Sequence, residues 1–271
     1  MVQHILNVSV FFTDGAKEIT PSFTQEWPVF SQAHQFSYTI PHTFAEQENG
    51  FEDIRVNYRL QALMESERTP AFAPRFSLVT PSGDADKDFG HDRLGYEVNL
   101  PFSKIVSDRW TVHFNAGGSV FPDVNDRDLW NYNLGGSAIY AVSRNFNLML
   151  ESVAFWEEDV ADPAEKRAAP SMTDEASTMD ENGRSWTTQL IARNRLPLGA
   201  ERVDPAKRID RTVTALLSPG ARYAFNTPSG AQLVVGFAVP IGLTSDSPDY
   251  GLFFYCSFEH AFTRVELNKA K

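Results

Sequence analysis

Apolar and polar residues alternate along many short segments of this sequence. In EDIRVNYRLQAL (52–63), Ile54, Val56, Tyr58 and Leu60 share one face, and the residues between them are polar or charged. A period of two is typical of a β-strand with one face in an apolar medium and the other in water. The pattern predicts an all-β protein, and by itself it does not say whether the apolar faces meet in a core or contact lipid.

Segments of this kind recur along the chain, separated by clusters of turn-forming residues. They predict about twelve strands, at 2–12, 22–31, 35–42, 53–63, 71–81, 92–102, 109–121, 130–142, 145–157, 212–225, 231–241 and 250–262. Pro28 cannot donate to a hydrogen-bond ladder, so we expect it at a bulge or strand end. Short and long connections alternate, with PDVNDRD (122–128) counted among the long ones. An even strand number with such alternation is typical of bacterial outer-membrane barrels.

A soluble or periplasmic β-sandwich, binding a ligand or partner without transport, is the alternative, because alternation alone fits both folds. The predicted strands are longer than the roughly 5–6 residues usual in globular proteins. Aromatic residues also stand near the ends of many apolar faces, as in the interfacial girdles of membrane barrels. We therefore predict an antiparallel up-and-down transmembrane β-barrel of about twelve strands, with the lipid bilayer outside and water inside.

Composition narrows the functional classes. The 271 residues fit a single barrel domain (1–271). A net charge of −11 argues against nucleic acid as a partner, which needs clustered Lys and Arg. Cys256 is the single cysteine, so an intramolecular disulfide is excluded, and no apolar run reaches the ~18 residues of a transmembrane helix. The amino terminus has no recognisable leader peptide, and we expect the chain to be the mature form.

The longest connection runs from about residue 157 to 210. Its first part (157–184) is rich in Asp and Glu, but no spacing matches a calcium loop with its central glycine. We expect a solvated extracellular loop here. The stretch that follows, RSWTTQLIARNRLPLG (184–199), is amphipathic, and two placements fit it: an extension of the neighbouring strands above the membrane, or a constriction folded into the barrel mouth.

Polar residues on the predicted inward face are the candidates for function. The candidate lumen-lining residues are Arg55, Arg59, Arg75, Arg93, Glu97, His113, Asn115, Asn131, Asn133, Glu151, Arg222 and Glu259. A wall of arginines would attract anions and set selectivity. The alternative is that these Arg and Glu residues pair with one another and fill the lumen, because unpaired buried charges are costly.

Motifs for enzymatic chemistry are not found in the sequence. There is no HExxH, no glycine-rich phosphate loop and no paired Cys or His cluster. His113, Asn115 and Ser119 do not have the spacing of an outer-membrane Ser–His enzyme. We expect no enzymatic activity, no catalytic residue, no metal site and no cofactor.

Four motifs in order resemble one bacterial family. They are NGFEDIRVNYRLQAL (49–63), PAFAPRFSLVTPSGD (70–84), LLSPGARYAF (216–225), and AVPIG with PDYGLFFYCSFEHAF (238–262). The family is the MetA-pathway of phenol degradation family, a set of transporter-like outer-membrane β-barrels. The resemblance implies a bacterial outer-membrane location and passage of small organic, aromatic or anionic, solutes. The chain departs from the usual barrel ending, because the polar tail TRVELNKAK follows Phe262.

Overall fold

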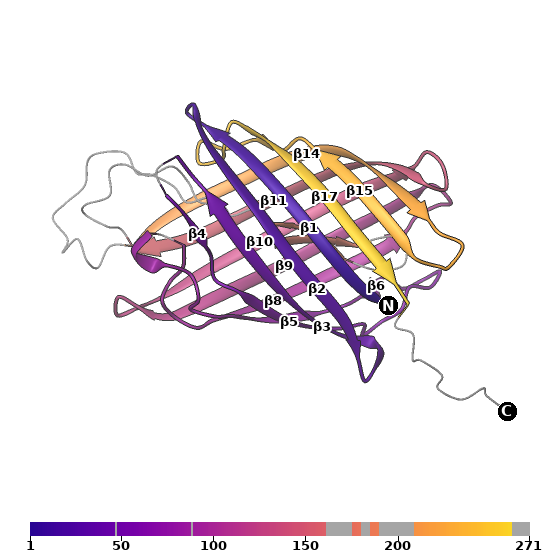
Figure 1. Cartoon of the computed structure of the whole chain (residues 1–271), viewed down its shortest axis with the longest axis horizontal. Coiled ribbons are helices and arrows are strands. Elements are labelled where there is room, and N and C mark those ends of the chain that lie inside the picture. Colours follow the sequence, from indigo (N-terminus) through magenta and orange to yellow (C-terminus); the bar gives the residue numbers. More distant parts are fainter. Residues whose placement is uncertain (47, 88, 161–174, 180–184, 190–208, 262–271) are drawn as a thin grey trace.

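The structure is a computed structural model that describes residues 1–271 except 47, 88, 161–174, 180–184, 190–208 and 262–271. Its main feature is a closed, antiparallel β-barrel of 12 strands (Figure 1). The uninterrupted strands are β1 (Val2–Thr13), β2 (Ala16–Val29), β3 (Ser31–Phe44), β8 (Gly95–Ile105), β9 (Trp110–Val124), β10 (Arg127–Ala141), β11 (Phe146–Val160), β14 (Ile209–Asn226) and β17 (Tyr250–His260). β1 pairs with β17, so the sheet has no open edge. A sandwich of two sheets is therefore not the fold.

Three of the twelve strands are interrupted. They are β4 (Asn49–Phe51) with β5 (Arg55–Leu60), β6 (Ala71–Phe72) with β7 (Arg75–Val79), and β15 (Gln232–Ala238) with β16 (Ile241–Gly242). Pro74 and Pro240 fall within two of the breaks, where the missing N–H removes a ladder hydrogen bond. Pro28 lies at a register shift between β2 and β3, next to the last residue of β2, which confirms the expected bulge.

The two barrel rims differ in their connections. We call the rim that carries both chain ends the terminal rim; its connections are 30, 61–70, 106–109, 142–145 and 227–231. The opposite loop rim carries 14–15, 45–48, 80–94, 125–126, the long segment between β11 and β14, and 243–249. The 3-10 helix η1 (Ala85–Lys87) lies within 80–94.

The predicted strict alternation of short and long links is wrong in detail. Residues 122–128 do not form a long link: β9 and β10 continue past the predicted ends to a two-residue turn at Asn125 and Asp126, both with positive φ. Asp14 and Gly15 form the same kind of turn between β1 and β2. Positive φ at both central residues is the geometry of a type I′ hairpin, which Asn, Asp and Gly tolerate. The strand order and up-and-down parity are unaffected.

The outer face of the barrel is apolar. Outward-pointing side chains on successive strands stay substantially exposed, for example Leu100 (37%), Phe114 (48%) and Leu134 (43%). Rings also gather toward the strand ends, such as Trp27 against Phe36 and Trp110 against Tyr140. An apolar surface of this extent, on a sheet without an edge, matches a barrel embedded in lipid.

The inner face is closely packed and carries most of the buried polar side chains. Asn57, Ser77, Asn99 and Thr214 alternate with the outward apolar residues, and each is at most 2% exposed. Buried apolar clusters that include Phe11, Leu129 and Phe253 lie on the same inner face. Within the described residues no helix is long and apolar enough to cross a membrane.

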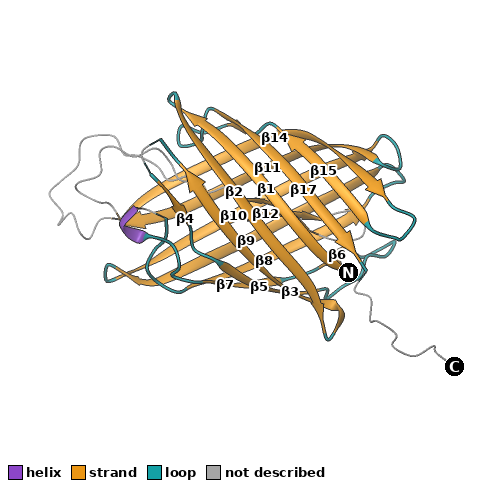
Figure 2. Cartoon of the chain, in the orientation of Figure 1, coloured by secondary structure: helices purple, strands orange, loops and turns teal. Residues whose placement is uncertain are grey.

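A separate hairpin lies inside the ring of strands. β12 (Glu175–Met179) and β13 (Ser185–Gln189) pair with each other; β12 contacts β8, β9 and β10, and β13 contacts β1. β1 stands across the ring from β8, β9 and β10, so a hairpin that touches both sides spans the interior (Figure 2). Of the two placements considered for 184–199, the described part, 185–189, fits the one folded into the barrel. The acidic stretch before it lies largely outside the described residues.

A charge on the outer face should destabilise the barrel. Leu100 is central in β8, and Leu100→Arg should lower the free energy of unfolding by about 2–4 kcal/mol, as expected for Arg near the bilayer midplane. The measurement is a denaturant titration of the protein folded in lipid vesicles. Val106→Arg introduces the same charged side chain at an exposed turn of the terminal rim, and it should lower the free energy of unfolding by less than about 0.5 kcal/mol. Equal losses would contradict a lipid-facing Leu100.

Candidate functional site

The most highly charged part of the inner face lies on β5, β7 and β8. Glu97 is 3% exposed and lies between two arginines: Arg75 Nη2 is 2.7 Å from its Oε1, and Arg55 Nε is 3.7 Å from its Oε2. The three strands are neighbours in the sheet and present these side chains to the same side. A carboxylate held by two guanidinium groups compensates much of the cost of burying all three charges.

Arg59 extends this cluster toward the terminal rim. It stands directly opposite Arg75 in the β5–β7 register, an arrangement of like charges that is unfavourable by itself. Its guanidinium lies 3.9 Å from the carboxylate of Glu26 on β2 and donates to the side-chain oxygen of Gln35 on β3. The acids that pair with the two arginines therefore come from different strands: Glu26 on β2 pairs with Arg59, and Glu97 on β8 pairs with Arg75.

Three arginines gather on this wall. We call Arg55, Arg59 and Arg75, with Glu26 and Glu97, the arginine wall. Its guanidinium groups face these two carboxylates, and Arg55 also interacts electrostatically with Asp53 toward the loop rim, in a protein whose net charge is −11. A fixed charge in a narrow region of low dielectric acts more strongly than the same charge in water. The wall can thus attract anions to the lumen.

The rest of the lumen is lined mainly by uncharged hydrogen-bonding groups. His113 Nδ1 is 2.8 Å from Ser103 Oγ, and the Asn115 amide donates to Asn133 Oδ1 at 3.3 Å. Gln3 donates to Glu259 Oε1 at 2.8 Å across the β1–β17 seam. These contacts join neighbouring strands and leave the walls polar without adding net positive charge.

Three further candidates lie on strands away from β5, β7 and β8. Arg222 is buried on the inner face of β14, and Glu151 on β11 pairs in register with Ser137 and Ser218. Asn131 accepts a 2.9 Å hydrogen bond from the backbone N–H of Glu158, just beyond the first β10–β11 pair. Among these residues, Arg222 lies within electrostatic reach of another candidate, His113 on β9.

Arg93 lies outside the strands. It belongs to the 80–94 connection at the loop rim, where its Nε donates to the backbone carbonyl of Asp123 at 2.8 Å and its Nη1 to that of Asp92 at 2.8 Å. The predicted strand begins at residue 92, whereas β8 begins at Gly95. Arg93 therefore ties the 80–94 connection to the β9–β10 hairpin.

Asp53 organises the loop rim, a role that the sequence reasoning missed. Its carboxylate accepts backbone N–H bonds from Ser82 (3.1 Å), Gly83 (2.8 Å) and His91 (3.2 Å). The side chain is only 7% exposed and sits in the break between β4 and β5. One acidic side chain thus supplies acceptors for both ends of the 80–91 segment. The hint of this role in the sequence is the acidic pair Glu52 and Asp53, which ends the segment NGFED (49–53) just before β5.

Close backbone contacts hold the same segment against the wall. A Cβ at Gly83 would lie 1.8 Å from the carbonyl oxygen of Phe89, so this position requires glycine. Phe89 is buried, and its ring approaches Gly50 on β4. Further out, Asp84 accepts a hydrogen bond from Lys87, which raises the pKa of that ammonium above its usual value. The 80–94 connection is therefore packed against the wall of the barrel.

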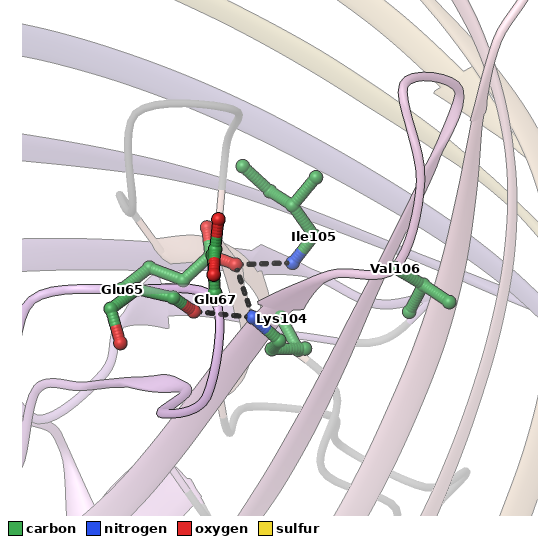
Figure 3. A pocket seen from close by; sticks show the side chains of 6 residues that line it. Glu65, Glu67, Lys104, Ile105 and Val106 are labelled. Atoms are coloured by element: carbon green, nitrogen blue, oxygen red, sulfur yellow. Dashed lines mark hydrogen bonds and ion pairs between the residues drawn. The ribbon is translucent and has the colours of Figure 1, made fainter.

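A cleft lies at the terminal rim, between the 61–70 connection and the end of β8 (Figure 3). It has a volume of about 570 Å³ and is lined by Glu65, Ser66, Glu67, Lys104, Ile105 and Val106. Lys104 Nζ is 2.9 Å from Glu65 Oε1, which also accepts the backbone N–H of Ile105 at 3.0 Å. These bonds pin the connection to the strand, and the Ser66 hydroxyl lies 2.6 Å from Thr69 Oγ1.

Comparison with known proteins supports the fold. The chain is similar to the crystal structure of the COG4313 outer membrane channel from Pseudomonas putida F1, with a TM-score of 0.61 and 12% identity, over 94% of this chain and 94% of that chain. It is also similar to the NanC porin, with a TM-score of 0.49 and 8% identity, over 95% of this chain and 100% of that one. No protein-family model matches the chain, and no curated protein matches it. The resemblance to the MetA-pathway family therefore stays a prediction.

Replacing Asp53 should release the 80–91 segment. Asp53→Ala leaves three backbone N–H groups without their acceptor, and we expect a loss of about 1–3 kcal/mol in the free energy of unfolding. Amide hydrogen exchange at Ser82, Gly83 and His91 should become faster. Asp84→Ala removes an exposed carboxylate from the same connection and should leave exchange at these amides unchanged. Unaltered exchange in Asp53→Ala would contradict the assigned role.

Proposed function

We propose that the protein is a passive, non-enzymatic channel of the bacterial outer membrane for small organic solutes, with a preference for anions. The observation that carries this proposal is the arginine wall on the inner face of a closed barrel whose outer face is apolar. The likeness to an outer membrane channel supports the fold alone. The membrane location rests on the apolar outer face together with the sequence pattern.

Anion preference follows from the charge of the wall. A carboxylate or phenolate entering the lumen loses hydration, and guanidinium groups can replace those hydrogen bonds in a planar, two-pronged geometry. Because Arg59 faces Arg75 across neighbouring strands, an anion between them would also relieve their repulsion. The aromatic character of the solute rests on the family resemblance alone.

The close packing of the lumen favours small solutes and slow passage. Arg55 and Glu97 are each about 3% exposed, and the β12–β13 hairpin occupies part of the interior. A solute must therefore pass between packed polar side chains or displace their partners. Pairing and selection are two roles of the same charges: the Glu97 pairs hold the wall together, and the three guanidinium groups offer hydrogen-bond donors to an entering anion.

Ion selectivity tests the proposal. In planar bilayers under a salt gradient, the reversal potential of the wild-type protein should indicate anion preference, because three guanidinium groups line one wall of the lumen. The double change Arg59→Gln and Arg75→Gln removes two of these positive charges and leaves Glu26, Glu97 and Asp53 in place, so the reversal potential should move toward cation preference.

Two control variants separate charge from structure. Arg59→Lys with Arg75→Lys keeps the charge and should keep anion preference. Arg144→Gln removes a charge from an exposed turn of the terminal rim and should leave selectivity unchanged. A barrel that conducts no current, or one whose selectivity survives the double Gln change, would leave only the pairing role for these arginines.

The proposed orientation places the loop rim outside the cell. In a Cys256→Ala background, Asn125→Cys at the tip of the β9–β10 hairpin should react with a large polyethylene-glycol maleimide on intact cells. Ser143→Cys in the β10–β11 turn should react only after the outer membrane is opened. The opposite labelling pattern would reverse the orientation.

A further inference from the structure

Two histidines face each other on the outer surface of the β1–β17 seam. His4 lies near the start of β1, and His260 is the last residue of β17. Their Nε2 atoms are 3.3 Å apart, whereas their ring centroids are 5.4 Å apart. The rings therefore approach each other through these nitrogens. Both side chains are partly exposed, at the terminal rim where β1 begins and β17 ends (Figure 1).

The separation of the nitrogens matches that of two ligands on one metal ion. Zinc bound by histidine has Zn–N distances of about 2.0–2.1 Å and tetrahedral geometry, which places two ligand nitrogens roughly 3.3–3.4 Å apart. The observed 3.3 Å needs only a small rotation of the two rings to aim both lone pairs at a common point. Paired strands hold the two backbones, with His4 opposite Phe258 and His260 opposite Val2.

The hydrogen bonding of His260 prepares its Nε2 to bind a cation. Its Nδ1 is 3.0 Å from the carbonyl oxygen of Ala261, which can only accept, so Nδ1 carries the proton in the neutral ring. Nε2 is then left with its lone pair, which the Nε2–H of His4 engages in the metal-free form. A metal-ligating histidine usually donates its other ring N–H to a carboxylate, a backbone carbonyl or water, as His260 does to Ala261.

Aromatic packing restrains both rings. Phe258 pairs with His4 across the seam and precedes His260 by two residues on the same face of β17. Its ring centroid is 6.2 Å from that of His4 and 5.7 Å from that of His260. Among the described residues no group of three or more His, Cys, Asp or Glu side chains could hold a metal ion, so the protein would supply two ligands and water the others. Imidazole ligands suit Zn²⁺, Cu²⁺ and Ni²⁺.

We propose that His4 and His260 form a two-histidine site for a divalent transition-metal ion, best suited to Zn²⁺, that bridges the first and last strands of the barrel. On binding, the Nε2 proton of His4 moves through water to Nδ1, and both Nε2 lone pairs coordinate the metal. The ion would cross-link the seam that closes the barrel and so stabilise the folded form. The proposal is independent of solute passage.

Metal binding and spectroscopy test this site directly. The protein is prepared in detergent without a polyhistidine tag and titrated with Zn²⁺, and Cu²⁺ is used as a spectroscopic probe. The wild type should bind one ion at this site, with two equatorial nitrogens in the Cu²⁺ paramagnetic resonance spectrum, and Zn²⁺ should raise its unfolding temperature. His4→Asn and His260→Asn should each weaken Zn²⁺ binding on the order of tenfold or more and remove the shift.

His34→Asn is the matched control. His34 lies on β3 toward the terminal rim and is bonded to Tyr58 instead of another histidine, so its loss should change neither binding nor the spectrum. Folding of each variant is checked by its heat-dependent mobility in gels, and His260→Gln replaces any variant that does not fold. Equal Zn²⁺ affinity in the wild type and both seam variants, or a Cu²⁺ spectrum without two nitrogens, would overturn the proposal.

Discussion

The closed ring of backbone hydrogen bonds is the constraint on which the rest of this structure depends. Lipid offers no partner for an N–H or C=O group, so a sheet that spans a bilayer must end where it begins. Here β1 pairs with β17 from Val2 opposite His260 to Phe12 opposite Tyr250. This pairing fixes the register of the whole wall, and a slip of one residue would turn every apolar side chain inward.

Closing the ring has a direct consequence for the charged residues. With the outer face given to lipid, Arg and Glu on the strands can only point inward, where space is limited and each charge must find a partner. The contact of Arg75 with Glu97 at 2.7 Å is one result, and the reach of Arg59 across to Glu26 on β2 is another. Selectivity in such a barrel then depends on the small imbalance that remains after pairing, and the net charge of the whole protein is a poor guide to it.

Sequence periodicity predicted the strands and which of their residues share a face, because every strand of a barrel faces the same two media. Strand length, the parity of the connections and aromatic residues at the strand ends were needed to predict a barrel instead of a sandwich. Periodicity does not specify where strands stop: positive φ at Asn125 and Asp126 allows β9 and β10 to continue where a loop was expected. Nor could it place Arg93, which joins the 80–94 connection to Asp123 near the end of β9, or recognise Asp53, whose partners are backbone groups 29–38 residues away.

Acidic side chains replace the backbone ladder where neighbouring strands separate toward the loop rim. Asp53 does so in the break between β4 and β5. Glu158 Oε2 accepts from the backbone N–H of Trp130 at 3.2 Å where β10 and β11 diverge, and Asp246 Oδ2 accepts from Val213 at 2.9 Å beside the end of β16. Each carboxylate satisfies an N–H that no strand reaches, and charged acceptors form stronger hydrogen bonds than neutral ones. Part of the protein's acidity is therefore structural: it lets connections of irregular shape join a wall whose backbone groups must all be paired.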